Sequence, residues 1–160
     1  MSALSYKFLG IVIIALMIGI FLSQLMAKNT YNKIIAEADR STRNFEEVYS
    51  LQINQENDAY ELTRLGSKQI KSGQFKIATI TLEKAAQLEP KYRDAWLFLG
   101  MANLKNNEAQ KAIESLLKAE IIDPINPETY KLLSLAYKQS NQNELAQKAE
   151  EKQNYLEKNK

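Results

Sequence analysis

From about residue 59 onward the sequence repeats itself with a period of 34 residues. Five sets of identical residues share this spacing: Gly66 and Gly100; Pro90 and Pro124; Ala78, Ala112 and Ala146; Leu65, Leu99 and Leu133; Ala85 and Ala119. A fixed period of this length indicates an array in which each repeat is one helical hairpin stacked on the next. This feature constrains the fold more than any other, because a single hairpin cannot bury its apolar face alone.

Proline and small residues at the repeated positions predict how each hairpin folds. Pro90 and Pro124 cannot continue a helix, so they follow the end of the second helix of a repeat. Gly66 and Ala78 have little or no side chain, so the two helices of one hairpin can cross there in close contact.

The repeated residues resemble the tetratricopeptide repeat (TPR) family. Its units carry an aromatic residue and a Leu-Gly pair in the first helix, alanines and a large apolar residue in the second, and a proline in the following turn. The central unit, residues 93–126, matches best, although it has Asn103 where the family has tyrosine. Its matching residues are Trp96, Leu99, Gly100, Ala112, Leu116, Ala119 and Pro124. The resemblance implies an all-α solenoid of three hairpins, with the other two at 59–92 and 127–156.

The composition removes several classes of function. The chain has no cysteine and no histidine, which excludes disulfides and thiolate chemistry and removes the commonest general base and neutral metal ligand. Its 21 basic and 19 acidic residues leave a net charge of +2, which gives no case for nucleic-acid binding. Ser115 and Lys118 fit the Ser-x-x-Lys pattern of penicillin-binding proteins, but the companion motifs are missing. We therefore expect no enzymatic activity, no metal and no cofactor.

Residues 8–27 contain no charge and are strongly apolar. A helix of this length spans about 30 Å, the thickness of the hydrocarbon layer, so the sequence predicts a transmembrane helix in a lipid bilayer. A cleaved signal peptide is the alternative, but Leu25 and Phe21 stand where cleavage needs small residues. Small residues recur at every fourth position, which predicts close packing on another membrane helix or arises by chance. They are Ala15, Gly19, Ser23 and Ala27.

The charges that flank this segment leave its orientation open. Basic residues after it outnumber Lys7 before it, which places the repeats on the cytoplasmic or stromal side. The short tail 1–7 has a lysine and the α-amine but no acid, which favours repeats on the extracytoplasmic side, and we prefer this second orientation. The predicted localisation is a single-pass protein of a bacterial inner membrane or an organelle membrane. The full predicted order is tail 1–7, transmembrane helix 8–27, helical spacer 28–58, repeat domain 59–156 and tail 157–160.

In the TPR family, the first helix of each repeat carries a stripe of residues at i, i+4 and i+7 that lines the concave groove. Here it comprises Thr63, Ser67 and Ile70, then Leu97, Met101 and Leu104, then Lys131, Leu135 and Lys138. The central stripe is apolar and is expected to anchor a partner, while Lys131 and Lys138 hold acidic groups or a carboxyl terminus. Alternatively, the spacer helix or a second copy of the chain covers it. The stripe departs from the Lys and Asn clamp with which some family members hold chaperone tails.

The sequence thus predicts a non-catalytic protein that scaffolds or assists the assembly of a membrane protein complex. Two alternatives stay open at this point. One is a permanent structural subunit of a membrane complex, and the other is a cytosol-facing targeting receptor or a photosystem-assembly type of factor. The expected partners are other proteins, the bilayer through residues 8–27, and a second copy of the chain in a homo-oligomer.

Overall fold

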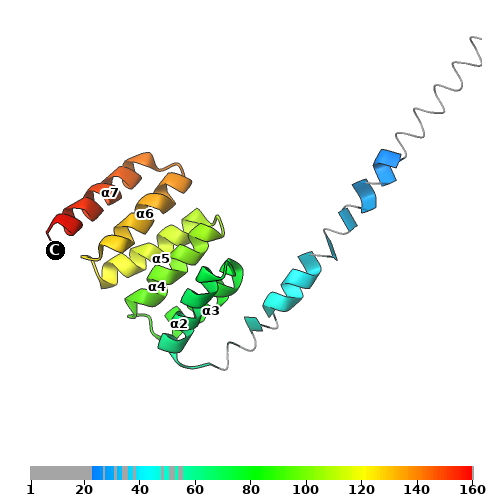
Figure 1. The fold of residues 1–160 in the computed structure, drawn as a ribbon, viewed down its shortest axis with the longest axis horizontal. Coiled ribbons are helices and arrows are strands. Elements are labelled where there is room, and N and C mark those ends of the chain that lie inside the picture. The colour runs from blue at the N-terminus through cyan, green and yellow to red at the C-terminus, as the bar shows by residue number, and fades with distance from the viewer. Residues whose placement is uncertain are drawn as a thin grey trace, which may run out of the picture. The chain divides into compact units, whose positions relative to one another are not determined.

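A computed structural model describes residues 23–26, 28–30, 32–33, 36–37, 39–47, 49–50, 53 and 56–159. The chain divides into two compact units between Glu46 and Glu47, and the second unit holds the repeat array. The described residues of the first unit are helical. Figure 1 shows the array as a stack of helices coloured from green to red.

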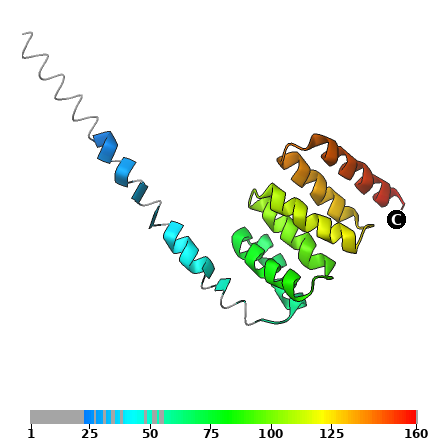
Figure 2. The ribbon, with the colours of Figure 1, turned by 180° about the vertical axis from the view of Figure 1, so that it is seen from behind.

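The array consists of three helical hairpins. In chain order the helices are α2 (Ala59–Lys71), α3 (Phe75–Leu88), α4 (Arg93–Lys105), α5 (Ala109–Ile122), α6 (Pro127–Gln139) and α7 (Asn143–Lys158). The hairpins are α2 with α3, α4 with α5, and α6 with α7, and each packs on the next (Figure 2). No strand occurs in the described part of the chain. The predicted all-α solenoid is therefore confirmed.

The turn inside each hairpin has the same geometry, built on a residue with positive φ. These residues are Gly73, Asn107 and Asn141, with φ of 78°, 62° and 60°. In each turn the next amide bonds back to a carbonyl near the end of the first helix, as Gln74 N does to Gln69 O at 2.9 Å. This is the Schellman motif, which uses a left-handed residue to satisfy the last carbonyls of a helix. The three residues are also 34 apart, a repeat signal that the sequence reading did not use.

In two of the three hairpins, a side-chain cap fixes where the first helix begins. Asp58 accepts bonds from the amides of Tyr60 and Glu61, at 2.8 and 3.2 Å, and so satisfies amides that have no helical partner. Asn126 accepts from the amide of Thr129 at 3.1 Å. Pro127 follows as the first residue of α6, where its missing N–H costs nothing.

Glycine permits the close crossing within the first two hairpins. A Cβ placed on Gly66 would lie 2.5 Å from Leu82 Cγ, and one on Gly100 would lie 2.5 Å from Leu116 Cγ. Leu82 and Leu116 are fully buried, so neither can move aside without opening the core. The crossing position in the third hairpin holds Ser134, which is also buried.

Three apolar clusters form the core, and Trp96 packs against all of them. Its indole Nε1 donates to the carbonyl of Pro90 at 2.9 Å, which ties α4 to the preceding turn. Tyr130 lies one repeat later and donates through its hydroxyl to Pro124 O at 2.8 Å. The aromatic residue of each of these units thus anchors the proline turn before it, which explains its place in the repeat.

The end of the segment before the array packs on the first hairpin. The hydroxyl of Tyr49 accepts from Gln69 Nε2 at 2.6 Å and lies 3.1 Å from Thr81 Oγ1. Ile53 is buried in the cluster that contains Leu62 of α2 and Ala85 of α3. This contact covers part of the apolar surface that the first hairpin would otherwise expose.

The predicted integral membrane localisation is corrected. None of the helices in the described part of the chain is long and apolar enough to cross a bilayer. Of the predicted span 8–27 only residues 23–26 are described, so Ala15, Gly19 and Ala27 lie outside the described residues, while Ser23 is exposed. The transmembrane element and the membrane partners inferred from it therefore have no support.

Candidate functional site: the inner stripe of the array

The first helices of the three hairpins form the inner side of the array. Helix α4 contacts both α2 and α6, whereas α3 and α5, and likewise α5 and α7, make no comparable contact among the described residues. The first helices are therefore closer together than the second helices, which curves the stack and places α2, α4 and α6 on its concave side.

The predicted groove residues differ widely in exposure along this inner side. Thr63 and Leu97 are buried, at 2% and 6% exposure. Ser67, Ile70, Met101 and Leu104 are half-buried. Lys131, Leu135 and Lys138 line the last stripe, where both lysines are exposed and Leu135 retains 49% of its accessible surface. The three stripes thus lie at equivalent positions but do not form one uniformly open surface.

Packing order explains this gradient. Helix α4 covers the stripe of α2, so Ile70 packs against the cluster of Leu99 and Ala102. Helix α6 covers the stripe of α4, so Leu97, Met101 and Leu104 join the cluster of Leu132 and Ala136. No described helix follows α6 on this side, and its stripe stays open. Leu97 is consequently a core residue, and its side chain is not available to an external partner in this structure.

The lysines of the open stripe are held by neighbouring acids. Lys131 Nζ lies 3.1 Å from Glu128 Oε2, one turn earlier in α6. Lys138 Nζ lies 2.9 Å from Glu150 Oε2 on α7. Both pairs are solvated, and exposed pairs of this kind contribute about 1 kcal/mol or less. Both lysines can therefore exchange these acids for a partner's carboxylates at little cost, on either side of Leu135.

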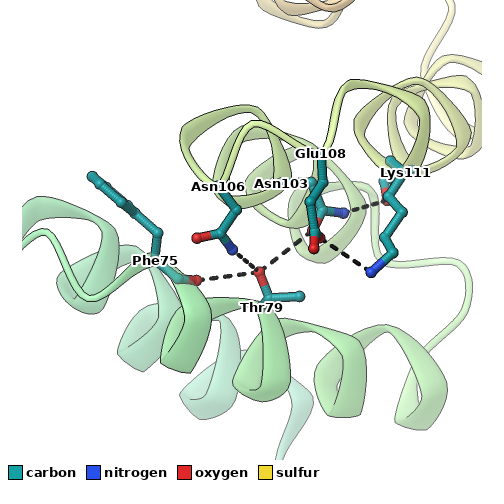
Figure 3. A network of polar contacts seen from close by, with 7 residues as sticks. Phe75, Thr79, Asn103, Asn106, Glu108 and Lys111 are labelled. Carbon is teal, nitrogen blue, oxygen red and sulfur yellow. Dashed lines mark hydrogen bonds and ion pairs between the residues drawn. The ribbon is translucent and has the colours of Figure 1, made fainter. Parts of the chain in front are cut away.

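A polar network lies on the other side of α4, between the first two hairpins (Figure 3). Thr79 Oγ1 accepts from Asn106 Nδ2 at 3.0 Å and lies 3.4 Å from Asn103 Oδ1. Asn103 is buried, and its amide reaches Ser115 Oγ at 3.5 Å. The network satisfies the buried amide of Asn103, which stands where the TPR pattern has a tyrosine.

Ser115 and Lys118 each make a contact with another part of the array. The Ser115 hydroxyl donates to the carbonyl of Lys111 at 2.9 Å, while Lys118 Nζ lies over the Trp96 ring, 5.1 Å from its centre. No cluster of metal-ligating residues occurs among the residues that the structure describes.

Two surface pockets that the sequence reading missed repeat with the 34-residue period. One, of about 410 Å³, includes Trp96, Asn103 and Lys118 in its lining, and the other, of about 360 Å³, includes Tyr130, Tyr137 and Lys152. Lys152 lies over Tyr130 at 5.9 Å, as Lys118 does over Trp96. The 34-residue spacing of Lys118 and Lys152 is visible in the sequence, but the sequence alone does not show that each lysine lies over an aromatic ring.

One carboxyl group in the lining of the first pocket has a shifted pKa. Burial of Glu83 raises its pKa, nearby Lys111 lowers it, and Glu108 raises it further. The net direction is upward, so this carboxyl takes up a proton more readily than an exposed glutamate does.

The arrangement of the array matches solved structures. A mutant of MamA superposes with a TM-score of 0.62 at 21% identity, over 69% of this chain and 82% of that one. The Arabidopsis OM64 TPR domain superposes with a TM-score of 0.61 at 20% identity, over 64% of this chain and 84% of that one. At such identities the likeness shows the fold alone, which is the fold of TPR domains.

The sequence is also similar to a curated protein, over a smaller share of that protein's length. The peroxisomal targeting signal receptor of Komagataella phaffii is 33% identical over 87 residues, which are 54% of this chain and 15% of that protein. The chain thus spans a small part of the relative's length. No protein-family model matches the sequence.

Proposed function

We propose that the protein is a non-catalytic scaffold that holds a segment of another protein on the inner side of its third hairpin. The observation that carries this proposal is Leu135, a large apolar side chain that is 49% exposed between two lysines on one helical face. Met101 and Leu104 lie half-buried on the adjacent helix and extend the apolar surface. Similarity to TPR domains supports a protein partner.

The stripe also indicates the chemistry of the partner segment. An apolar side chain would lie against Leu135 and Met101, and burying such a side chain is worth about 1.5–3 kcal/mol. Carboxylates on either side of it would replace the solvated pairs at Lys131 and Lys138. A short segment with an apolar residue between acidic groups, or with a carboxyl terminus, fits this surface best.

Affinity capture with the full-length chain as bait tests the proposal. Leu135→Ser is expected to lower the recovery of a bound protein by roughly tenfold or more, as expected for a central interface anchor. Ile121→Ser is the matched control, because Ile121 is 81% exposed on α5, outside the stripe. Equal recovery with both variants would contradict the proposal, and so would a loss confined to Ile121→Ser.

A receptor for targeting signals is the second candidate function. The similarity to the peroxisomal targeting signal receptor favours it, although the match spans 15% of that protein. A labelled peptide that ends in Ser-Lys-Leu, with a free or an amidated carboxyl terminus, separates this candidate from a general scaffold. A receptor would bind only the free-acid form and would lose that binding with Lys131→Ala and Lys138→Ala. No binding of either form would eliminate this candidate and leave the scaffold proposal intact.

A further inference from the structure

The first hairpin exposes a face that is covered in the other two. Leu65 on α2 is 38% exposed, whereas its counterparts Leu99 and Leu133 are 4% and 2% exposed. Those counterparts are buried because a preceding hairpin packs against them. On this side of α2, Tyr49 and Ile53 of the preceding segment make contact, and they reach Gln69 and the cluster of Leu62.

The uncovered face is hollowed as well as apolar. A pocket of about 520 Å³ lies there, and α2 contributes Glu61, Leu62, Arg64, Leu65 and Lys68 to its lining. Tyr49, Ile53 and Glu56 complete the wall. The end of the array is thus partly capped, with an open strip along α2.

The charges along this strip of α2 complement those of the same strip in a second copy of the chain. Glu61, Leu65 and Lys68 are spaced i, i+4 and i+7, so they share one face of α2. When two such helices lie antiparallel about Leu65, the acid of each faces the base of the other. Glu61 already bonds Arg64 Nε at 3.0 Å, while Lys68 takes part in no ion pair among the described residues.

The opposite end of the array provides a comparison with the same spacing. On α6 the residues are Lys131, Leu135 and Lys138, again around an exposed leucine. Antiparallel pairing of two such helices would place lysine against lysine, which opposes self-association. Of these two helix faces, the α2 face is therefore the self-complementary one.

We propose that two copies of the chain associate through this face, with α2 of one copy antiparallel to α2 of the other and Leu65 at the two-fold axis. Such an interface is isologous, so one surface strip supplies both sides and the assembly closes as a dimer. Each copy then supplies the helix that covers the other's Leu65, as a preceding hairpin does for Leu99. The inner stripe of the third hairpin lies on a different helix and stays free for a partner protein.

Disulfide trapping tests this dimer directly, because the chain has no cysteine. In the full-length protein, Leu65→Cys places one thiol of each copy at the two-fold axis, within the Cα separation of about 4.4–6.8 Å that a disulfide needs. We expect Leu65→Cys to form a covalent dimer under mild oxidation, at least tenfold faster than the control Leu135→Cys. Equal rates would reflect chance collision, and a faster Leu135→Cys would place the contact at the other end; either result would overturn the proposal.

Charge reversal in the Leu65→Cys background separates a specific pairing from a general surface effect. Glu61→Lys or Lys68→Glu alone places like charges opposite each other and should slow cross-linking severalfold. The two together exchange the charges and should restore most of the rate, provided that circular dichroism shows each variant folded. Absence of this rescue would exclude the antiparallel pairing. A slow Leu65→Cys reaction would overturn the dimer, and protection of that thiol by an added protein would assign the face to that protein instead.

Discussion

The inner stripes of α4 and α6 occupy the same place in their hairpins, yet the first is mostly covered and the second is open. Leu97, Met101 and Leu104 pack against α6, whereas Lys131, Leu135 and Lys138 have no described helix beyond them. The difference shows that position in the stack decides how far the side chains of a stripe are exposed. The covered stripe of α4 is apolar throughout, and the open stripe of α6 has charged residues on both sides of its leucine.

The largest expected difference is in the free energy of unfolding between serine substitutions in the two stripes. Leu97→Ser should lower the free energy of unfolding by about 3 kcal/mol, because it removes buried apolar volume and leaves a hydroxyl in the core. Leu135→Ser should change it by about 0.5 kcal/mol or less. Urea unfolding followed by circular dichroism measures both, and equal losses would show that the two stripes are equally buried.

A second comparison concerns the close crossings of the second and third hairpins. Gly100→Ala should cost about 1–3 kcal/mol, since its Cβ would lie 2.5 Å from Leu116 Cγ and 3.3 Å from the Ala112 carbonyl oxygen. Ser134→Ala should be close to neutral, because that position already holds a Cβ. Thermal unfolding of the two variants tests this, and a tolerated Gly100→Ala would mean that the crossing is looser than described.

The anchoring aromatics predict a difference at alkaline pH. Burial, and then the nearby Glu120 and Asp123 carboxylates, raise the pKa of Tyr130 from 10.0 to about 12. The neutral phenol therefore contributes stability that is fully present below pH 10 and is lost as the pH rises towards 12. The loss should be on the order of 2 kcal/mol.

Tyr130→Phe isolates this contribution. The variant loses the bond to Pro124 O at every pH, so it starts less stable than the unmodified chain. Its stability should then fall less steeply between pH 10 and 12. Parallel curves for the two proteins in urea titrations at several pH values would show that Tyr130 titrates normally.

The smallest expected effect lies in the hairpin turns. Gly73→Ala should cost about 1 kcal/mol, because φ is 78° there and alanine disfavours that region. Gly73→Asn should cost less, since the equivalent turns hold Asn107 and Asn141 at positive φ. Thermal denaturation distinguishes the two, and a larger loss with asparagine would contradict the equivalence of the turns.

The 34-residue period was enough to predict the hairpins, because Gly66, Gly100, Pro90 and Pro124 act locally at crossings and turns. Burial of Leu97 was not predictable from helix periodicity, since it depends on which helix of the next hairpin lies against it. The contact of Tyr49 with Gln69 and Thr81 also escaped prediction, because the preceding segment shows no repeat.

The prediction of an integral membrane localisation is wrong for a different reason. It was inferred from hydropathy in residues 8–27, almost all of which lie outside the described chain, and no described helix can cross a bilayer. The candidate groove residues stay a prediction as a binding site, although the structure places them on the first helix of each hairpin as expected. Their accessibility depends on the order of the stack, which the residues of a single repeat do not specify.

Thiol labelling of single cysteines tests most directly the claim that stack position decides the role of a stripe. Cysteine replaces Leu97 in one variant and Leu135 in another of this cysteine-free chain, and the reaction with a thiol reagent is followed under native conditions. Leu135→Cys should react at nearly the rate of a free thiol. Leu97→Cys should react at least about a hundredfold more slowly, because labelling then requires the hairpin to open. Similar rates at the two positions would contradict the account.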